Sequence, residues 1–123
     1  MQDLILSGWD LFKNQDFFEA HDQWEEAWQE MSGNRRMFWQ AMIQLSVSAY
    51  HALNNHPSGA ISQARKALTK FQSIPGLSNR SDVRELASLT SEWILILEKA
   101  SFPEIRLFTE TRLSSVPETI LSI

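Results

Sequence analysis

The chain has 123 residues, which suits a single domain. Its hydrophobic content is 43%, and five Trp and seven Phe supply most of the apolar area for a core. The chain has no cysteine, which excludes disulfides, thiolate metal sites and cysteine nucleophiles. The net charge is −4 and the basic residues form no stripe, which argues against nucleic-acid binding.

Two further features bear on where the protein is found. No apolar run approaches the roughly 20 residues that are needed to span a bilayer. The first residues, Met1 to Asp3, lack the positive region of a signal peptide. We therefore expect a cytoplasmic protein that is not held in a membrane.

The apolar pattern predicts an all-α fold, a single-domain bundle of about five helices. The first helix is expected over residues 2–13, where Leu4, Ile5, Trp9 and Phe12 recur at helical spacing. The second is expected over residues 17–31. It follows a capping-box pattern at Asp16 and Glu19, and Gly33 suits the left-handed position after its last turn.

The next two helices are expected over residues 34–54 and 58–71. The former is apolar on most sides, which is typical of the buried centre of a bundle. The latter carries the small residues Ala60, Ala64 and Ala67, which allow a close approach between the two helices. As a pair they resemble one helical hairpin of the tetratricopeptide kind, although one hairpin is not an array.

The last predicted helix runs to residue 99 and begins at a second capping-box pattern, Asp82 with Glu85. Pro103 and Pro117 then argue against another long helix. We expect residues 1–101 to form the bundle and residues 102–123 to form an extended tail packed on it. The apolar residues expected to anchor this tail are Phe102, Ile105, Leu107 and Phe108.

A titratable pair lies among the aromatic residues of the second helix. His21 and Glu25 are four residues apart and share a face, beside Trp24 and Trp28. At about 100° per residue, His21 falls within the apolar stripe and Glu25 on its shoulder. Such a pair beside large rings is either a structural network or a site.

The third predicted helix carries a matching polar row. Gln40, Gln44, Ser48 and His51 are spaced to share one face of this otherwise apolar helix. Buried polar groups need hydrogen-bond partners, and the His21/Glu25 edge of an antiparallel second helix is the simplest one. The sequence therefore predicts a polar pocket between the two helices, formed by His21, Glu25, Trp28, Gln44, Ser48 and His51.

The run Phe-Phe-Glu-Ala-His-x-x-Trp-Glu-x-x-Trp over residues 17–28 resembles the signature of the DUF309 family, small helical bacterial and archaeal proteins of unknown function. The family motif His-x-x-x-Glu-x-x-Trp/Tyr falls on His21, Glu25 and Trp28. The resemblance covers about residues 9–72. It implies an all-α domain and suggests that the His/Glu motif binds metal. Asp22 and Ala41 depart from the family pattern, which often has Glu and Gly there.

Two interpretations of the pocket remain open. The residues favour a scaffold or binding module in which His21 and Glu25 form a structural network. The alternative is a metal-binding protein, with a metal-dependent hydrolase as one form of it, in which His21, Glu25 and His51 hold a divalent metal such as zinc. The sequence leaves enzymatic activity, the partner and a homodimer undecided. A Trp-lined cleft for a small ligand is a third hypothesis.

Overall fold

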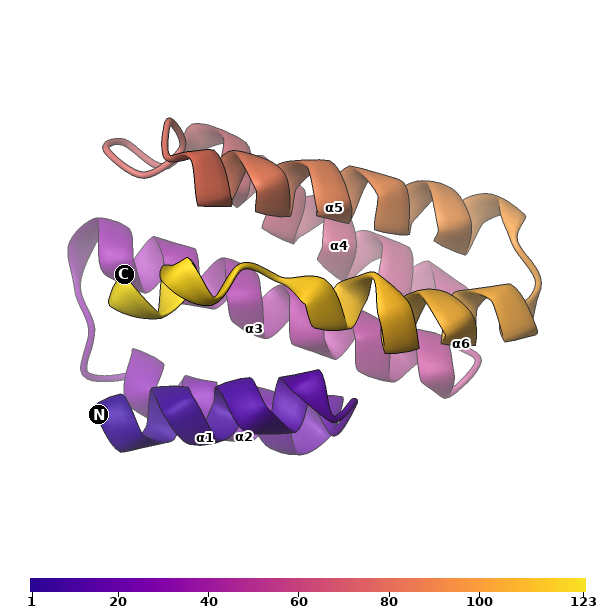
Figure 1. Ribbon diagram of the computed structural model, residues 1–123, viewed down its shortest axis with the longest axis horizontal. Coiled ribbons are helices and arrows are strands. Elements are labelled where there is room, and N and C mark those ends of the chain that lie inside the picture. Colours follow the sequence, from indigo (N-terminus) through magenta and orange to yellow (C-terminus); the bar gives the residue numbers. More distant parts are fainter.

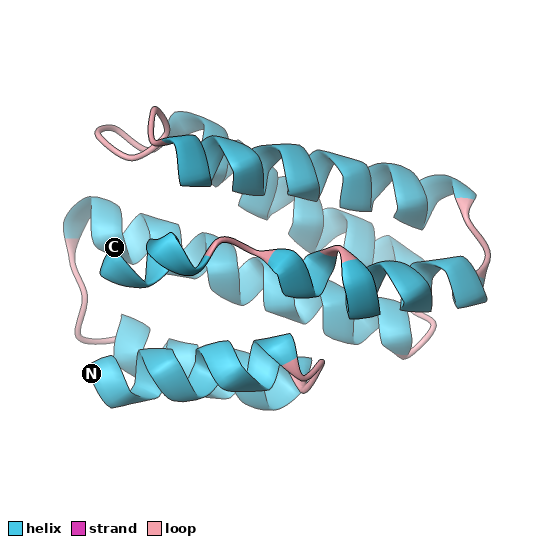
Figure 2. Cartoon of the chain, viewed as in Figure 1, coloured by secondary structure: helices cyan, strands magenta, loops and turns pink.

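The computed structural model describes all 123 residues, and every regular element in it is a helix. Its six α-helices are α1 (Gln2–Lys13), α2 (Phe17–Trp28), α3 (Gly33–Leu53), α4 (Pro57–Ser73), α5 (Ser81–Lys99) and α6 (Phe102–Thr111), labelled in Figure 1. Two short 3-10 helices follow, η1 (Leu113–Ser115) and η2 (Glu118–Ser122). The all-α prediction is confirmed, with six α-helices rather than five (Figure 2). None of them has the length and apolar character of a membrane span.

The helices form two layers (Figure 1). In this view α2, α3 and α4 form the rear layer, while α1, the segment from α6 to the C-terminus, and α5 lie in front. The most extensive helix pair is α3 with α4, followed by α1 with α2. α3 contacts α2 on one side, α4 on the other and α6 in front. It is therefore the central helix of the rear layer, and its remaining side is left for solvent.

The expected extended tail is wrong in its conformation. Residues 102–111 form helix α6, because Pro103 lies in the first turn, where a backbone N–H has no partner within the helix. The segment does pack on the bundle. Ile105 and Phe108 are buried as expected, whereas Phe102 and Leu107 are exposed. The η1 and η2 turns add buried apolar residues that were not predicted as anchors, namely Leu113, Val116 and Ile120.

The capping boxes lie elsewhere than the pattern suggested. Neither Asp16 nor Arg80, the N-cap residue of α5, makes a side-chain capping hydrogen bond. The complete capping box is at the start of α6. There the side chains of Ser101 and Glu104 each accept a hydrogen bond from the backbone N–H of the other residue. This capping box lies at the start of α6, a helix that Pro103 and Pro117 had argued against.

The front and rear layers meet at Trp24, which is fully buried in the core. Its ring lies 5.5 Å from the ring centroids of both Phe12 and Trp39, so it contacts α1 and α3 at once. The indole N–H donates to the Ile5 carbonyl oxygen at 3.0 Å. On the α1 side the ring lies against Gly8, where a Cβ atom would fall 2.3 Å from the indole nitrogen. Gly8 is thus the gap in α1 that accepts the tryptophan.

We predict that Gly8→Ala destabilises the protein, although the same change stabilises most helices by about 0.5–1 kcal/mol. The added methyl overlaps a ring that is buried and hydrogen-bonded, so α1 must shift, at a cost of about 1–3 kcal/mol. Chemical denaturation monitored by circular dichroism measures the free energy of unfolding. The matched control is Ser7→Ala, at an exposed neighbouring position of the same helix, which should be neutral or slightly stabilising. Equal stability of Gly8→Ala and Ser7→Ala would contradict the packing argument.

A buried carboxylate ties the C-terminal segment to α5. Asp82 accepts two hydrogen bonds from the Arg80 guanidinium, at 3.0 and 2.8 Å, and one from the Thr119 hydroxyl at 2.7 Å. Arg80 also donates to the Ser122 hydroxyl at 3.3 Å. These bonds, those from Arg80 first, hold the pKa of Asp82 below its ordinary value despite its burial. Asp82 was predicted as a helix cap, and it joins two distant segments instead.

We predict that Asp82→Asn lowers the free energy of unfolding at neutral pH by about 1.5–3 kcal/mol, the usual range for hydrogen bonds to a charged group. Because the pKa is lower in the folded state, the ionised carboxylate stabilises the fold fully above the unfolded pKa of about 4. That stabilisation is lost as the pH falls through the folded pKa. The stability difference between wild type and variant should therefore shrink below about pH 4. Urea titrations at several pH values test this, and a constant difference would contradict it.

Candidate functional site

The orientation of α2 is set by its buried side, which consists of Phe17, Ala20, Trp24 and Ala27. At about 100° per residue, the motif residues His21 and Trp28 then lie at the edge of this buried side, on the part of α2 that faces α3. Glu25 lies further out, and its side chain is 50% exposed. The motif thus borders α3 without entering the core.

His21 makes contacts within its own helix. Its Nδ1 atom donates to the Phe18 carbonyl oxygen at 2.6 Å, and its ring packs edge-on against the Phe18 ring at 5.0 Å. Its Nε2 atom faces the carboxylates of Glu25 at 3.4 Å and Asp22 at 3.7 Å. His21 and Glu25 are therefore neighbours on one face, as predicted, and Asp22 flanks the same nitrogen.

Trp28 closes the other end of the motif. Its indole N–H donates to the Arg36 carbonyl oxygen at 2.9 Å, and the Arg36 guanidinium lies 3.8 Å from the ring centroid. This cation–π contact fixes the turn between α2 and α3. Beside it is a small hollow of about 150 Å³, lined by Glu25, Trp28, Gln40, Ile43 and Gln44. Three of the six predicted pocket residues, Glu25, Trp28 and Gln44, line this hollow.

The other half of the polar row faces a different helix. Ser48 is buried between α4 and α5, where its hydroxyl donates to the Ala60 carbonyl oxygen at 2.6 Å and accepts from the Trp93 indole at 2.9 Å. The His51 ring lies against Gly59 of α4, and its Nδ1 atom is buried without a hydrogen-bond partner. The prediction that Ser48 and His51 join the pocket beside α2 is therefore wrong.

The angular spacing along α3 explains this correction. Ser46 marks the side that faces α2, because its hydroxyl donates to the Phe17 carbonyl oxygen at 2.7 Å. At about 100° per residue, Gln44, Ser48 and His51 lie roughly 140–160° away from that direction. Gln44, like Gln40, still lines the hollow bordered by α2, and the Gln44 Oε1 atom accepts a hydrogen bond from Lys70 of α4 at 2.9 Å. The polar row follows the α4 side of α3.

The proposed metal ligands do not converge. His21 and Glu25 are close, but His51 faces α4, and no group of three or more His, Asp or Glu side chains is placed to hold a metal ion. The donor set that the sequence suggested therefore does not fit a three-ligand metal site.

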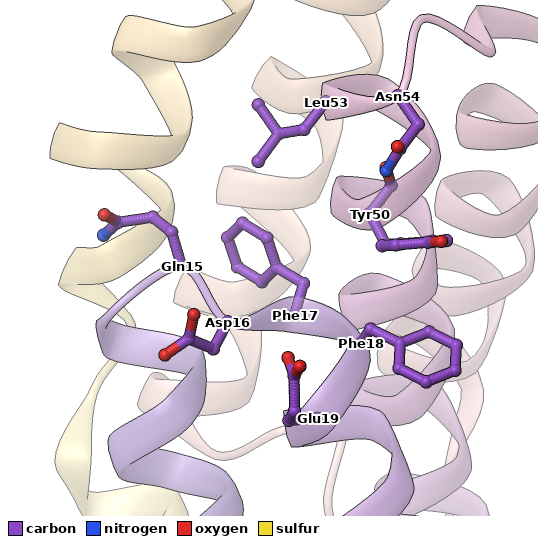
Figure 3. A pocket seen from close by; sticks show the side chains of 8 residues that line it. All are labelled: Gln15, Asp16, Phe17, Phe18, Glu19, Tyr50, Leu53 and Asn54. Carbon is purple, nitrogen blue, oxygen red and sulfur yellow. The ribbon is translucent and has the colours of Figure 1, made fainter.

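A larger hollow of about 390 Å³ lies where the start of α2 meets the end of α3 (Figure 3). Its lining residues are Gln15, Asp16, Phe17, Phe18, Glu19, Tyr50, Leu53 and Asn54. Phe18 and Tyr50 form its aromatic edge, with ring centroids 5.2 Å apart. They remain 45% and 37% exposed. This exposed pair joins the motif directly, because Phe18 also contacts His21.

The sequence analysis did not single out this aromatic pair, although a signal was present. Consecutive residues on a helix point about 100° apart, so Phe17 and Phe18 cannot both face the core. Phe17 is buried, and Phe18 is the ring left outside.

The model of DUF309, described as a domain of unknown function, matches residues 5–63. This match confirms the resemblance to DUF309. It includes the whole motif and the pairing of α2 with α3. It stops short of residue 72, where the resemblance was expected to end. Comparison with curated proteins and with solved structures gives no match.

We predict that His21→Ala lowers the free energy of unfolding by about 1–3 kcal/mol, because the Phe18 carbonyl loses its donor and the Phe18 ring loses its neighbour. The matched control is His56→Ala. His56 is exposed and its side chain makes no hydrogen bond, so little change is expected there. Thermal and urea unfolding of both variants measures the difference. Equal stability of the two variants would refute a structural role for His21.

Proposed function

We propose that the protein is a small helical binding or scaffold module, in which the His21/Glu25 pair is structural. The observation that carries this proposal is the use of the motif histidine. Its Nδ1 atom and its ring both hold Phe18, whose own ring is exposed next to Tyr50. A histidine engaged in this way supports a surface, and exposed aromatic residues are enriched where proteins bind one another.

The α3/α4 helix pair supports the same role. The hairpin of α3 and α4 is similar to a tetratricopeptide hairpin, with Ala60, Ala64 and Ala67 fully buried between the helices. In this proposal the hairpin is the rigid support, and the α2/α3 edge supplies the contact residues.

We predict that a photo-crosslinking amino acid at Phe18 gives discrete covalent adducts in cells that express the protein. The same residue at Leu95 is the control, because Leu95 is 53% exposed on α5, away from the α2/α3 edge. Adducts at Phe18 and none at Leu95 would support the proposal. Equal labelling at both sites, or none at Phe18, would count against a binding surface at this edge.

A separate experiment tests the alternative that the motif binds a metal ion. If the motif binds a divalent metal, protein purified without chelator carries that metal in stoichiometric amount and His21→Ala lacks it. Elemental analysis of wild type and His21→Ala distinguishes the two interpretations. A stoichiometric metal that is lost in the variant would replace the structural account with the metal account.

A further inference from the structure

The outer side of the rear layer has an uneven distribution of charge. Helix α2 carries four acidic residues and no Lys or Arg, whereas α4 carries three basic residues and no acid. On the sides that flank α3, Asp22 and Glu25 form no ion pair with Lys or Arg, and both carboxylates lie near the His21 Nε2 atom. On α4, Arg65 pairs with Glu98 of α5, whereas Lys66 and Lys70 form no ion pair, and Lys70 donates to the Gln44 amide oxygen. The pKa of Lys70 is lowered by burial and by Lys66, as expected for a cation without a counter-charge.

Between these charged helices, α3 exposes large apolar and aromatic side chains of the kind that is found in protein interfaces. Met37 and Tyr50 are 38% and 37% exposed, and Gln40, Gln44 and Val47 between them are half-buried. Thirteen residues of helix separate Met37 from Tyr50, a distance of roughly 20 Å. The helix with the longest apolar pattern in the chain thus has one side on which no other helix packs, although Lys70 and Phe18 contact it from the edges.

The acidic and basic residues lie at the same height along α3. Glu25 and Gln44 line one small hollow, and Lys70 hydrogen-bonds to the same Gln44 from the opposite side. A twofold axis parallel to α3 exchanges the two flanks and keeps the height. It would therefore place Glu25 of one copy over Lys70 of another, and the reverse contact would form at the same time.

We propose that a second copy of this chain covers the α2–α3–α4 face and forms a closed, twofold-symmetric dimer with the two α3 helices parallel. The axis passes near Gln44, so that α2 of each protomer lies on α4 of the other. A twofold axis across the helices would instead place acidic α2 on acidic α2, which like-charge repulsion disfavours. The dimer goes beyond the proposed binding role and rests on it, because it names the partner of the same edge.

Sedimentation equilibrium of the full chain tests the dimer. Wild type should approach twice the 14.2 kDa mass of one chain as concentration rises, and less so at high salt. The variants Asp22→Lys/Glu25→Lys and Lys66→Glu/Lys70→Glu should each weaken self-association at least about tenfold, since reversed pairs repel at both contacts. An equimolar mixture of the two variants should regain the dimer, because every reversed contact then meets its opposite charge.

Matched controls carry the same net-charge changes away from the face. Asp3→Lys/Asp10→Lys on α1 and Arg84→Glu/Arg106→Glu on α5 and α6 should dimerise like wild type. If a double variant melts early, the exposed single changes Asp22→Lys and Lys66→Glu replace it in the same mixing experiment.

Three outcomes would overturn the dimer: a monomeric mass for wild type into the high micromolar range, face variants that still dimerise, or a mixture that stays monomeric. If Phe18 still crosslinks to another protein in the first case, the proposed binding role stands while the dimer fails. If the dimer forms but Phe18 gives no adducts, the Phe18 edge fails as the binding surface.

Discussion

The arrangement of the bundle depends on one close approach, that of the Trp24 ring to Gly8. The ring fills the gap left by the missing side chain and contacts Phe12 and Trp39 from the same position. Its N–H is satisfied by the Ile5 carbonyl, so a large polar-tipped side chain is buried without an unpaired donor. Because Trp24 contacts α1 and α3 together, it fixes both the rotation of α2 about its own axis and the position of α2 relative to these two helices.

The geometry of the motif follows from that rotation. His21 precedes Trp24 by three residues and Trp28 follows it by four, so both lie on the turn beside the buried ring. Phe18 is a further turn back and points outward, where the His21 Nδ1 atom holds its carbonyl oxygen. Metal binding or acid–base chemistry by the His21 imidazole is therefore not needed to explain why a histidine lies at this position. A donor of the right length beside an exposed ring explains it equally well.

Periodicity predicted the helices well, and the bounds of α1 and α5 agree closely with the pattern. Periodicity failed where the same residue type occurs in two different structural settings. Pro103 was taken as a breaker, but proline is tolerated in a first turn, and Ser101 with Glu104 starts the helix there. The polar row of α3 was correctly placed on one face, but the spacing does not show which helix packs against that face. Ser46, a single buried hydroxyl outside that row, shows which side meets α2.

The assignment of faces on α3 also bears on its composition. A helix that is apolar on most sides was expected to be surrounded, but α3 has neighbours on only three sides. Ser48 satisfies its hydroxyl through Ala60 and Trp93, so the buried part of the polar row belongs to the internal fold. Tyr50 packs against Phe18, whereas Met37 and Val47 have no such internal role, and all three lie between an acidic helix and a basic one. In the proposed dimer a second copy of the chain covers the apolar residues on that side, and the separated charges determine how the two copies are oriented.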